Sequence, residues 1–284
     1  MDHEAWSDAQ VEATVTVDGR ERSVAYYDGG DEGDPPVVFL HGIPTWSFLW
    51  REVAAALEDE HRVVAPDLLG YGNSEMTDAF DRSIRAQEAM LGGLLDDLGI
   101  DGASDLALVG HDIGGSVALR YAWHEPDVVE KLVLSNAGCY DSWPVEFING
   151  IGLPGAVTGM DDEEFEETMG FVFENGLYGD SVAHDEFAAG MRAPWDSTAG
   201  RTSLERCAVA TNTNHTTEID YAAIAAETLL LWGADDVLQS IDYAERLAED
   251  ISGPTEVVPL AEAYHWVVED RPEAYADHLA EFLG

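Results

Sequence analysis

The stretch Gly110-His111-Asp112-Ile113-Gly114-Gly115 decides the fold, because it lies between a strand pattern and a helix pattern. The run at 105–109 (Asp-Leu-Ala-Leu-Val) predicts a buried strand, and the run at 116–122 (Ser-Val-Ala-Leu-Arg-Tyr-Ala) predicts a helix. Small residues at 110, 114 and 115 allow a tight turn that projects the side chain of residue 112 into a cavity. A turn of this kind presents a nucleophile, and here the side chain is a carboxylate.

A carboxylate at this position narrows the reaction class. A serine would attack acyl carbons, whereas a carboxylate suits displacement at a saturated carbon and gives an alkyl-enzyme ester that water must then cleave. Asp112 is therefore the predicted nucleophile.

Strand and helix patterns alternate along the chain. Strands are expected near 14–17, 24–27, 37–40, 62–65, 106–109, 131–134 and 228–232, and helices near 48–58, 82–98, 115–124, 243–250 and 272–283. The first two strands are expected to pair antiparallel across Asp18-Gly19. The alternation predicts an α/β fold with a mostly parallel sheet and helices on both faces.

The alternation stops between 140 and 220, where a glycine-rich segment, an acidic helix near 161–173 and a polar stretch at 211–217 follow one another. We interpret 140–220 as a mainly helical cap inserted into a core formed by 1–139 and 221–284.

Three further motifs fall where strands are expected to end, which is where open parallel sheets bind ligands. His41-Gly42-Ile43-Pro44-Thr45 follows one strand, so the backbone N–H groups of Ile43 and Ile113 can form a two-donor oxyanion site. Trp232-Gly233-Ala234-Asp235-Asp236 ends another strand and supplies a carboxylate, Asp236 or its neighbour Asp235, that can orient a histidine.

Ala263-Tyr264-His265-Trp266 supplies that histidine, and the chain order of nucleophile, acid and histidine favours His265 as the general base. The remaining histidines have no such support. His41 and His111 are expected to brace their turns, and His61, His124 and His278 to lie in solvated loops or helices.

Composition limits the function classes. The chain has 284 residues, 46% of them hydrophobic, and no apolar run of the roughly 20 residues that a membrane span needs. The start of the sequence does not resemble a signal peptide, so a cytoplasmic location is expected. Cys139 and Cys207 are too few for a disulfide framework and lack zinc-ligand spacing, and no phosphate-binding loop is present. We expect no metal and no cofactor.

The formal net charge is −44, from 57 acidic and 13 basic residues, and Lys131 is the single lysine. Self-repulsion at this charge density destabilises a compact chain in dilute buffer, whereas at 1 M salt the Debye length falls to about 3 Å. The composition resembles that of proteins from salt-accumulating halophiles. It also argues against nucleic acid as a partner. The expected partners are a small-molecule substrate and water, and the sequence leaves the oligomeric state open.

Together these motifs resemble the α/β-hydrolase fold family, which implies an eight-stranded sheet. The aspartate at the turn resembles the branch of epoxide hydrolases and haloalkane dehalogenases. The runs at 41–51 (His-Gly-Ile-Pro-Thr-Trp-Ser-Phe-Leu-Trp-Arg) and 66–74 (Pro-Asp-Leu-Leu-Gly-Tyr-Gly-Asn-Ser) look particularly like the dehalogenase-like members.

Two departures weaken a haloalkane or haloacid dehalogenase interpretation. Those enzymes typically hold the departing halide with the side chain after His-Gly and with an indole N–H after the nucleophile, and both positions are isoleucine here, Ile43 and Ile113. Losing both donors should cost about 3 kcal/mol each. An epoxide needs less from these positions, because its leaving oxygen stays attached to the substrate.

In the family, cap tyrosines usually protonate that oxygen, so an epoxide hydrolase-like activity is the preferred expectation. The candidate donors in the cap are Tyr178, Trp195 and Tyr140, with His184 and His215 as looser candidates. An ester or lactone hydrolase or decarboxylase, and a non-catalytic binding protein on the same scaffold, are the alternatives from other classes.

Overall fold

The strand before the Asp112 turn lies inside the sheet and is covered on both faces, as its continuous apolar sequence predicts. Every residue of β5 (Leu106–His111) is buried, as expected for a parallel strand covered on both faces. The computed structural model describes residues 1–179, 182–211 and 214–284. Within those residues eight strands form one sheet in the order β1-β2-β4-β3-β5-β6-β7-β8. The other strands are β1 (Val11–Val17), β2 (Arg20–Gly29), β3 (Pro36–Leu40), β4 (Arg62–Pro66), β6 (Val129–Ser135), β7 (Glu227–Gly233) and β8 (Thr255–Leu260).

The sheet is antiparallel at one edge and parallel elsewhere. β1 pairs with β2 through a two-residue hairpin at Asp18 and Gly19, and both residues have positive φ (51° and 72°), as primed hairpin turns require. β2 pairs antiparallel with β4, and the pairs from β4 through β3, β5, β6 and β7 to β8 are parallel. The predicted hairpin and the predicted mostly parallel sheet are both confirmed.

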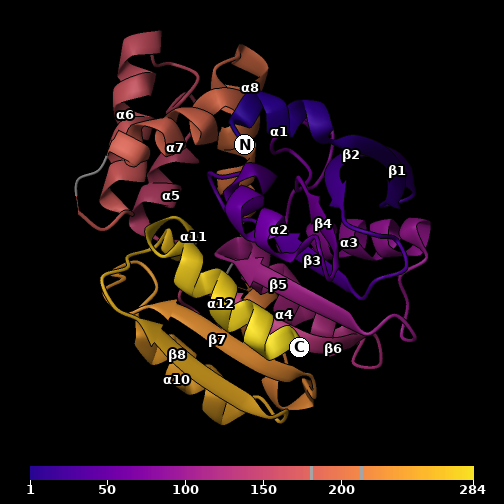
Figure 1. The fold of residues 1–284 in the computed structure, drawn as a ribbon. Helices are drawn as coiled ribbons and strands as arrows, with labels where there is room; N and C mark the ends of the chain where they lie inside the picture. The colour runs from indigo at the N-terminus through magenta and orange to yellow at the C-terminus, as the bar shows by residue number, and fades with distance from the viewer. Residues whose placement is uncertain (180–181, 212–213) are drawn as a thin grey trace.

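Helices cover both faces of the sheet. Figure 1 shows α12 in front of the sheet and α4 and α10 behind it. α2 packs against α12, and α3 packs against α4. The core helices and short 3₁₀ turns are α1 (His3–Ala9), η1 (Ser47–Trp50), α2 (Arg51–Leu57), α3 (Ile84–Leu98), α4 (Ile113–His124), η3 (Tyr221–Ala223), α10 (Ile241–Asp250), α11 (Val267–Asp270) and α12 (Pro272–Leu283).

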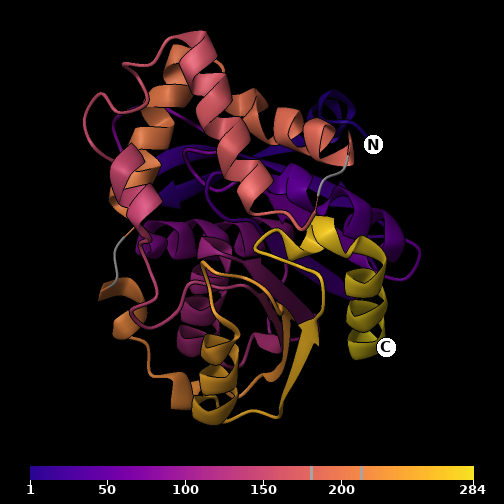
Figure 2. The same cartoon turned by 90° about the vertical axis from the view of Figure 1, so that its left-hand side faces the viewer.

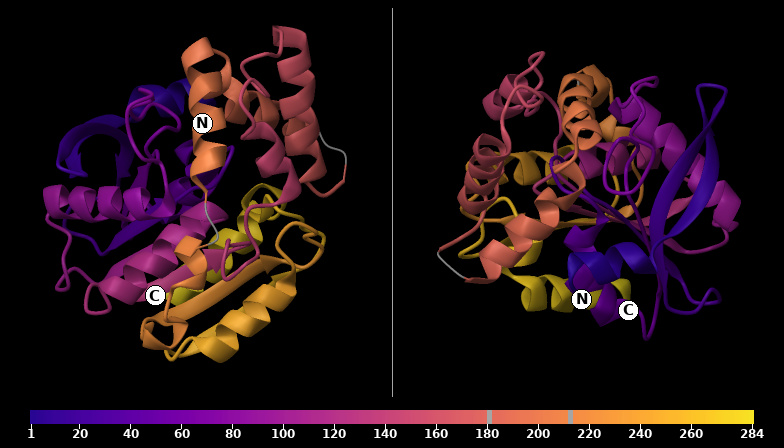
Figure 3. Two further views of the ribbon diagram at one scale, coloured as in Figure 1. Left: turned by 180° about the vertical axis from the view of Figure 1, so that it is seen from behind. Right: turned by 90° about the horizontal axis from the view of Figure 1, so that it is seen from above.

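A group of helices between β6 and β7 lies over one end of the sheet, as Figure 2 shows from the side and Figure 3 from above. The acidic helix that the sequence predicts is α6, and it begins with a capping box in which Asp161 and Glu164 bond each other's backbone N–H groups. The elements in this region are α5 (Glu146–Ile151), α6 (Asp162–Asn175), α7 (Val182–Arg192), η2 (Ala193–Trp195), α8 (Thr198–Ala210) and α9 (Asn214–Thr217).

The structure also shows the state of the two cysteines and whether any described helix could span a membrane. Cys139 and Cys207 are free and buried. Across 1–179, 182–211 and 214–284, no helix is both long enough and apolar enough to cross a membrane.

Candidate active site

The turn after β5 has the strained geometry that its sequence predicts. Asp112 has φ 52° and ψ −123°, a conformation that costs energy for a residue with a side chain and that occurs mainly at functional sites. The surrounding backbone fixes it, because the N–H of Gly138 donates to the Asp112 carbonyl at 2.9 Å. Gly114 is required for the close approach, since a Cβ at that position would lie 2.3 Å from the Leu40 carbonyl oxygen.

The two carboxylate oxygens of Asp112 have different surroundings. Oδ1 accepts a hydrogen bond from the backbone N–H of Ile43 at 2.8 Å. Oδ2 is buried, has no hydrogen-bond partner among the described residues, and lies 3.6 Å from Nε2 of His265. Gly42 makes this contact possible, because a Cβ there would lie 2.4 Å from Oδ1. The backbone N–H of Ile113, the first residue of α4, belongs to the helix start, where N–H groups have no partner within the helix.

His265 connects two carboxylates that are far apart in the sequence. Its Nδ1 donates to Oδ2 of Asp236 at 2.9 Å, while its Nε2 faces Asp112. All three side chains are at least 90% buried. The neighbouring Asp235 is exposed, so Asp236 is the acid in contact with the histidine. The three predicted side chains thus form a triad-like arrangement at the carboxyl ends of the strands.

The charges within this group determine which forms the side chains adopt. Burial disfavours the charged form of His265, but Asp236 and Asp112 outweigh it and raise the pKa of His265 to about 10. Burial also opposes the charge on Asp236, yet His265 and the hydrogen bonds that Asp236 accepts lower its pKa below the usual value. The raised pKa of His265 and the lowered pKa of Asp236 favour an imidazolium paired with the Asp236 carboxylate at neutral pH.

Asn136 completes the support of Asp236, and the sequence analysis missed it. It follows β6 directly, and its Nδ2 donates to Oδ2 of Asp236 at 2.5 Å while its Oδ1 accepts from the N–H of Gly233 at 3.0 Å. The available signal was its place in the chain, because a polar residue directly after a buried parallel strand lies at the same sheet edge as the other motifs.

The two turn histidines brace the backbone, as predicted. His41 donates from Nδ1 to the Gly42 carbonyl at 2.8 Å and accepts at Nε2 from the N–H of Leu68 at 2.9 Å. Burial lowers the pKa of His41 to about 3, so it is neutral and can accept at Nε2. Nδ1 of His111 donates to the Ser135 carbonyl at 3.0 Å.

The candidate donors of the cap make contacts of their own. Trp195 donates its indole N–H to the Pro44 carbonyl at 2.8 Å, and the Tyr140 hydroxyl donates to Asp250 at 2.8 Å. Tyr178 is 39% exposed and packs edge-on against Tyr264. The His215 carbonyl accepts from Arg120 on α4. The side chain of His184 lies outside the described residues. None of these described side chains lines the cavity that contains His265.

That cavity has a volume of about 210 Å³, and its walls are mostly apolar. Ile43 and His265 lie at the triad, and Trp266 forms part of the wall. The indole of Trp266 packs against the His265 ring at 4.7 Å, and its buried N–H has no hydrogen-bond acceptor within the described residues. Trp266 is a second residue that the sequence analysis did not single out as functional.

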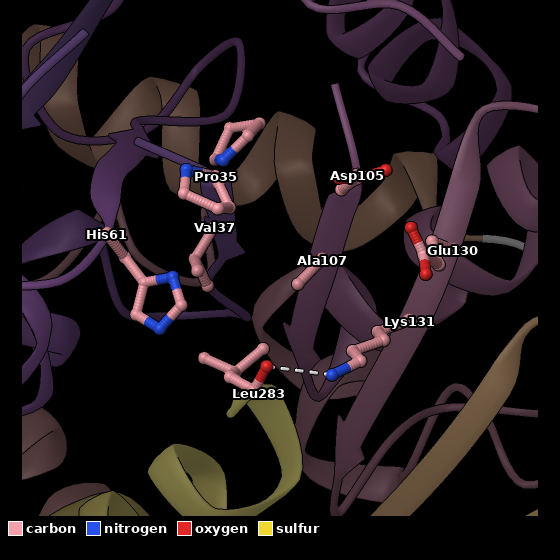
Figure 4. Close-up of a pocket in the computed structure, with 9 residues that line it drawn as sticks. Pro35, Val37, His61, Asp105, Ala107, Glu130, Lys131 and Leu283 are labelled. Carbon is pink, nitrogen blue, oxygen red and sulfur yellow. Dashed lines mark hydrogen bonds between the residues drawn. The ribbon is translucent and has the colours of Figure 1, made fainter. Parts of the chain in front are cut away.

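A separate cavity of about 190 Å³ lies at the opposite end of the sheet, where β3 and β5 begin. Figure 4 shows Lys131 there with its Nζ directed at the carbonyl of Leu283. Ligands of open parallel sheets bind at the carboxyl ends of the strands, so this cavity is not the candidate active site. Among residues 1–179, 182–211 and 214–284, no group of three or more His, Cys, Asp or Glu side chains could hold a metal ion.

Comparisons with known proteins identify the family of this chain. Residues 37–278 match the model of the alpha/beta hydrolase family. Haloalkane dehalogenase 2 of Mycobacterium tuberculosis is 30% identical over 272 residues, which cover 89% of this chain and 90% of the relative. The soluble epoxide hydrolase of Corynebacterium sp. is 29% identical over 280 residues, 88% of this chain and 90% of the relative.

Among solved structures, an alpha/beta hydrolase fold protein from Burkholderia ambifaria superposes with a TM-score of 0.83 at 27% identity, over 95% of this chain and 97% of the other. The predicted α/β-hydrolase fold is thereby confirmed. The chain belongs to the alpha/beta hydrolase family and is a hydrolase related to haloalkane dehalogenases and epoxide hydrolases.

Proposed function

We propose that the protein hydrolyses an apolar electrophile through a covalent ester on Asp112, with epoxides as the preferred substrate class. The observation that carries this proposal is the difference in hydrogen bonding between the two carboxylate oxygens of Asp112. Oδ2 has no hydrogen-bond partner among the described residues and is free to attack, while Oδ1 is held by the Ile43 N–H at 2.8 Å.

The first step forms a bond from Oδ2 to a saturated carbon and breaks the bond from that carbon to its leaving group. For an epoxide the leaving atom is the ring oxygen. The carbon–oxygen bond breaks, and the resulting alkoxide takes up a proton from solvent water and remains in the product as a hydroxyl. Positioning supplies most of the rate of this step, because the carboxylate is already buried and oriented.

The second step cleaves the ester that results. Oδ1 has become the ester carbonyl oxygen, and the Ile43 N–H that already holds it can stabilise the oxyanion, together with the N–H of Ile113. Esterification removes the negative charge of Asp112, which is one of the causes of the raised pKa of His265. His265 then loses its proton to solvent more readily and can take a proton from the attacking water, while Asp236 keeps the ring oriented. The acyl C–O bond breaks, His265 gives that proton to the departing alkoxide of the product, and the carboxylate of Asp112 is restored.

The side chains beside Asp112 support an epoxide over an organohalide. Ile43 and Ile113 offer no polar side-chain atom to a departing halide, whose full charge needs donors. An epoxide oxygen stays attached to the substrate and therefore depends less on these two positions.

An organohalide is the second candidate, and one observation favours it. The unpartnered indole N–H of Trp266 belongs to a residue that lines the same cavity as His265. An indole N–H is a hydrogen-bond donor suited to a halide, and it would replace one of the two side-chain donors that are absent at Ile43 and Ile113.

The test traps the intermediate. The His265→Gln variant, incubated in salt-containing buffer with styrene oxide, 1-bromobutane, fluoroacetate or a β-lactone, should accumulate an adduct on the peptide that contains Asp112. An epoxide adds its whole mass to that peptide, whereas a bromoalkane adds its alkyl group and releases bromide, so mass spectrometry separates the classes.

Wild-type enzyme in H₂¹⁸O provides an independent check. Attack of water on the ester carbonyl places ¹⁸O in the carboxylate of Asp112, whereas direct attack of water on the substrate leaves the peptide unlabelled. Asp112→Ala is the control and should abolish both signals. An unlabelled Asp112 peptide after many turnovers of any substrate, with no adduct in the histidine variant, would refute the proposal.

A further inference from the structure

The cavity at His265 continues outward to the molecular surface. Its inner part is formed by Ile43 and His265, next to Asp112. Its outer part is formed by the α6 side of the cap and by the loop after β7, with Phe171, Val237 and Leu238 among the lining residues. One continuous space therefore connects His265, which faces Asp112, with solvent.

The outer residues are unusually exposed for apolar side chains. Val237 is 88% exposed, Phe171 64% and Leu238 41%. They are three of the eight large hydrophobic side chains that are exposed in the described part of the chain. Exposed apolar side chains that gather at one place, rather than singly, mark a binding surface. We call Phe171, Val237 and Leu238 the apolar rim.

We propose that the apolar rim binds the alkyl chain of an elongated substrate whose reacting carbon lies at Asp112. This inference rests on the proposed function of Asp112 and adds the substrate class, an electrophile with a long unbranched apolar tail. A short substrate fills only the inner part, whereas a longer chain also covers the rim and removes its apolar surface from water.

The alternatives fit the charge of the molecule less well. A net charge of −44 opposes close contact with an anionic membrane surface or with a second copy of the same chain, and salt shortens the range of this repulsion without changing its sign. Neither occupant accounts for the continuity of the rim with His265, whereas a substrate tail does.

The test is the chain-length dependence of kcat/KM for 1,2-epoxyalkanes from 1,2-epoxybutane to 1,2-epoxydecane, repeated with 1-bromoalkanes if these are the better substrates. Each methylene that reaches the rim should raise kcat/KM of the wild type by about fourfold. The Phe171→Asn and Val237→Asn variants should lose most of this increase, so the ratio between the longest and shortest substrates falls by tenfold or more in the double variant.

Leu153→Asn and Val209→Asn are matched controls, because these residues are 62% and 61% exposed and do not line the cavity. They should keep the wild-type ratio. Each variant is judged by the ratio of kcat/KM for the longest and shortest substrates, measured in one preparation. Partial loss of folded protein lowers both values equally and leaves this ratio unchanged.

The outcomes separate this inference from the function on which it rests. Suppose that His265→Gln forms a normal adduct on Asp112, but kcat/KM does not change with chain length or the rim variants keep the wild-type ratio. The proposal that the apolar rim binds the substrate tail is then wrong, while Asp112 remains the nucleophile. Loss of self-association or of vesicle binding in the rim variants, with a flat series, would assign the surface to a protein or lipid contact instead. Absence of both adduct and turnover overturns the proposed function and the rim together.

Discussion

At the scale of the residue, the charges of the candidate site matter as much as the distances between its side chains. His265 lies between Asp112 and Asp236, and both carboxylates favour its protonated form. All three side chains are buried, so each charge strongly affects the others. Such an arrangement links the chemistry of the site to the stability of the folded chain.

The raised pKa of His265 predicts a pH-dependent stability. An unfolded histidine titrates near pH 6.5, whereas His265 in the folded chain has a pKa of about 10. Between these values the folded chain binds a proton that the unfolded chain does not, so the free energy of unfolding falls as pH rises from about 6.5 to about 10. Unfolding followed by circular dichroism at constant high salt, at pH 6.5 and 9.5, should show this fall in the wild type.

The His265→Gln variant should lose that component, because glutamine does not titrate. His278→Gln is the matched control, since it removes a histidine from α12, away from the triad, and should retain the wild-type slope. Equal slopes in the wild type and in His265→Gln would mean that the triad does not hold its proton in this pH range.

Sequence patterns located Asp112 and Asp236 because each follows a recognisable strand end, and His265 because it precedes the last helix and completes the expected order of nucleophile, acid and histidine. They did not locate Asn136, since its function depends on β6 and β7 being neighbours, which is a property of the sheet. The contacts of Trp195 and Tyr140 were equally hidden, because they join cap segments to Pro44 and Asp250, which are distant in sequence.

At the scale of the element, strands with continuous apolar runs and the β1–β2 hairpin were predicted well, whereas β8 and α1 were not. β8 was not identified individually, because Glu256 and Pro259 interrupt its pattern. Such residues are tolerated there because β8 is an edge strand, where a missing backbone donor leaves no neighbour unpaired. The short helix α1 was missed for another reason, since Trp6 is its one buried residue and gives no periodic pattern.

The carboxyl end of the last helix, α12, is capped by a side chain from the sheet. Nζ of Lys131 on β6 donates to the carbonyls of Phe282 and Leu283, each at 2.8 Å, and places a positive charge at the carboxyl end of the helix. Lys131→Met should therefore lower the free energy of unfolding by about 1–2 kcal/mol. Thermal unfolding in high salt measures this change.

Lys131→Arg is the control, because it keeps the charge and the donors and should recover most of the stability. Turnover should not change in either variant, since Lys131 lies at the opposite end of the sheet from Asp112. A methionine variant as stable as the wild type would show that α12 is held by packing alone.

At the scale of the whole molecule, the charge sets the conditions under which the fold persists. Ion pairs such as Arg62 with Asp28 and Arg51 with Glu269 neutralise single acids, but 57 acidic residues face 13 basic ones. Most carboxylates are therefore left without a cationic partner. The compact state concentrates these charges, and the unfolded chain separates them.

The expected consequence is a salt requirement for folding. Screening shortens the range of the repulsion from about 10 Å at 0.1 M salt to about 3 Å at 1 M, so the free energy of unfolding should rise steeply over this interval. Far-UV circular dichroism should show loss of helix when salt is dialysed away and its return when KCl or NaCl is restored. Sucrose at equal osmolality is the control, since it strengthens apolar burial without screening charge. If sucrose restores structure as fully as salt, or if the chain stays folded in dilute buffer, charge repulsion is not what limits its stability.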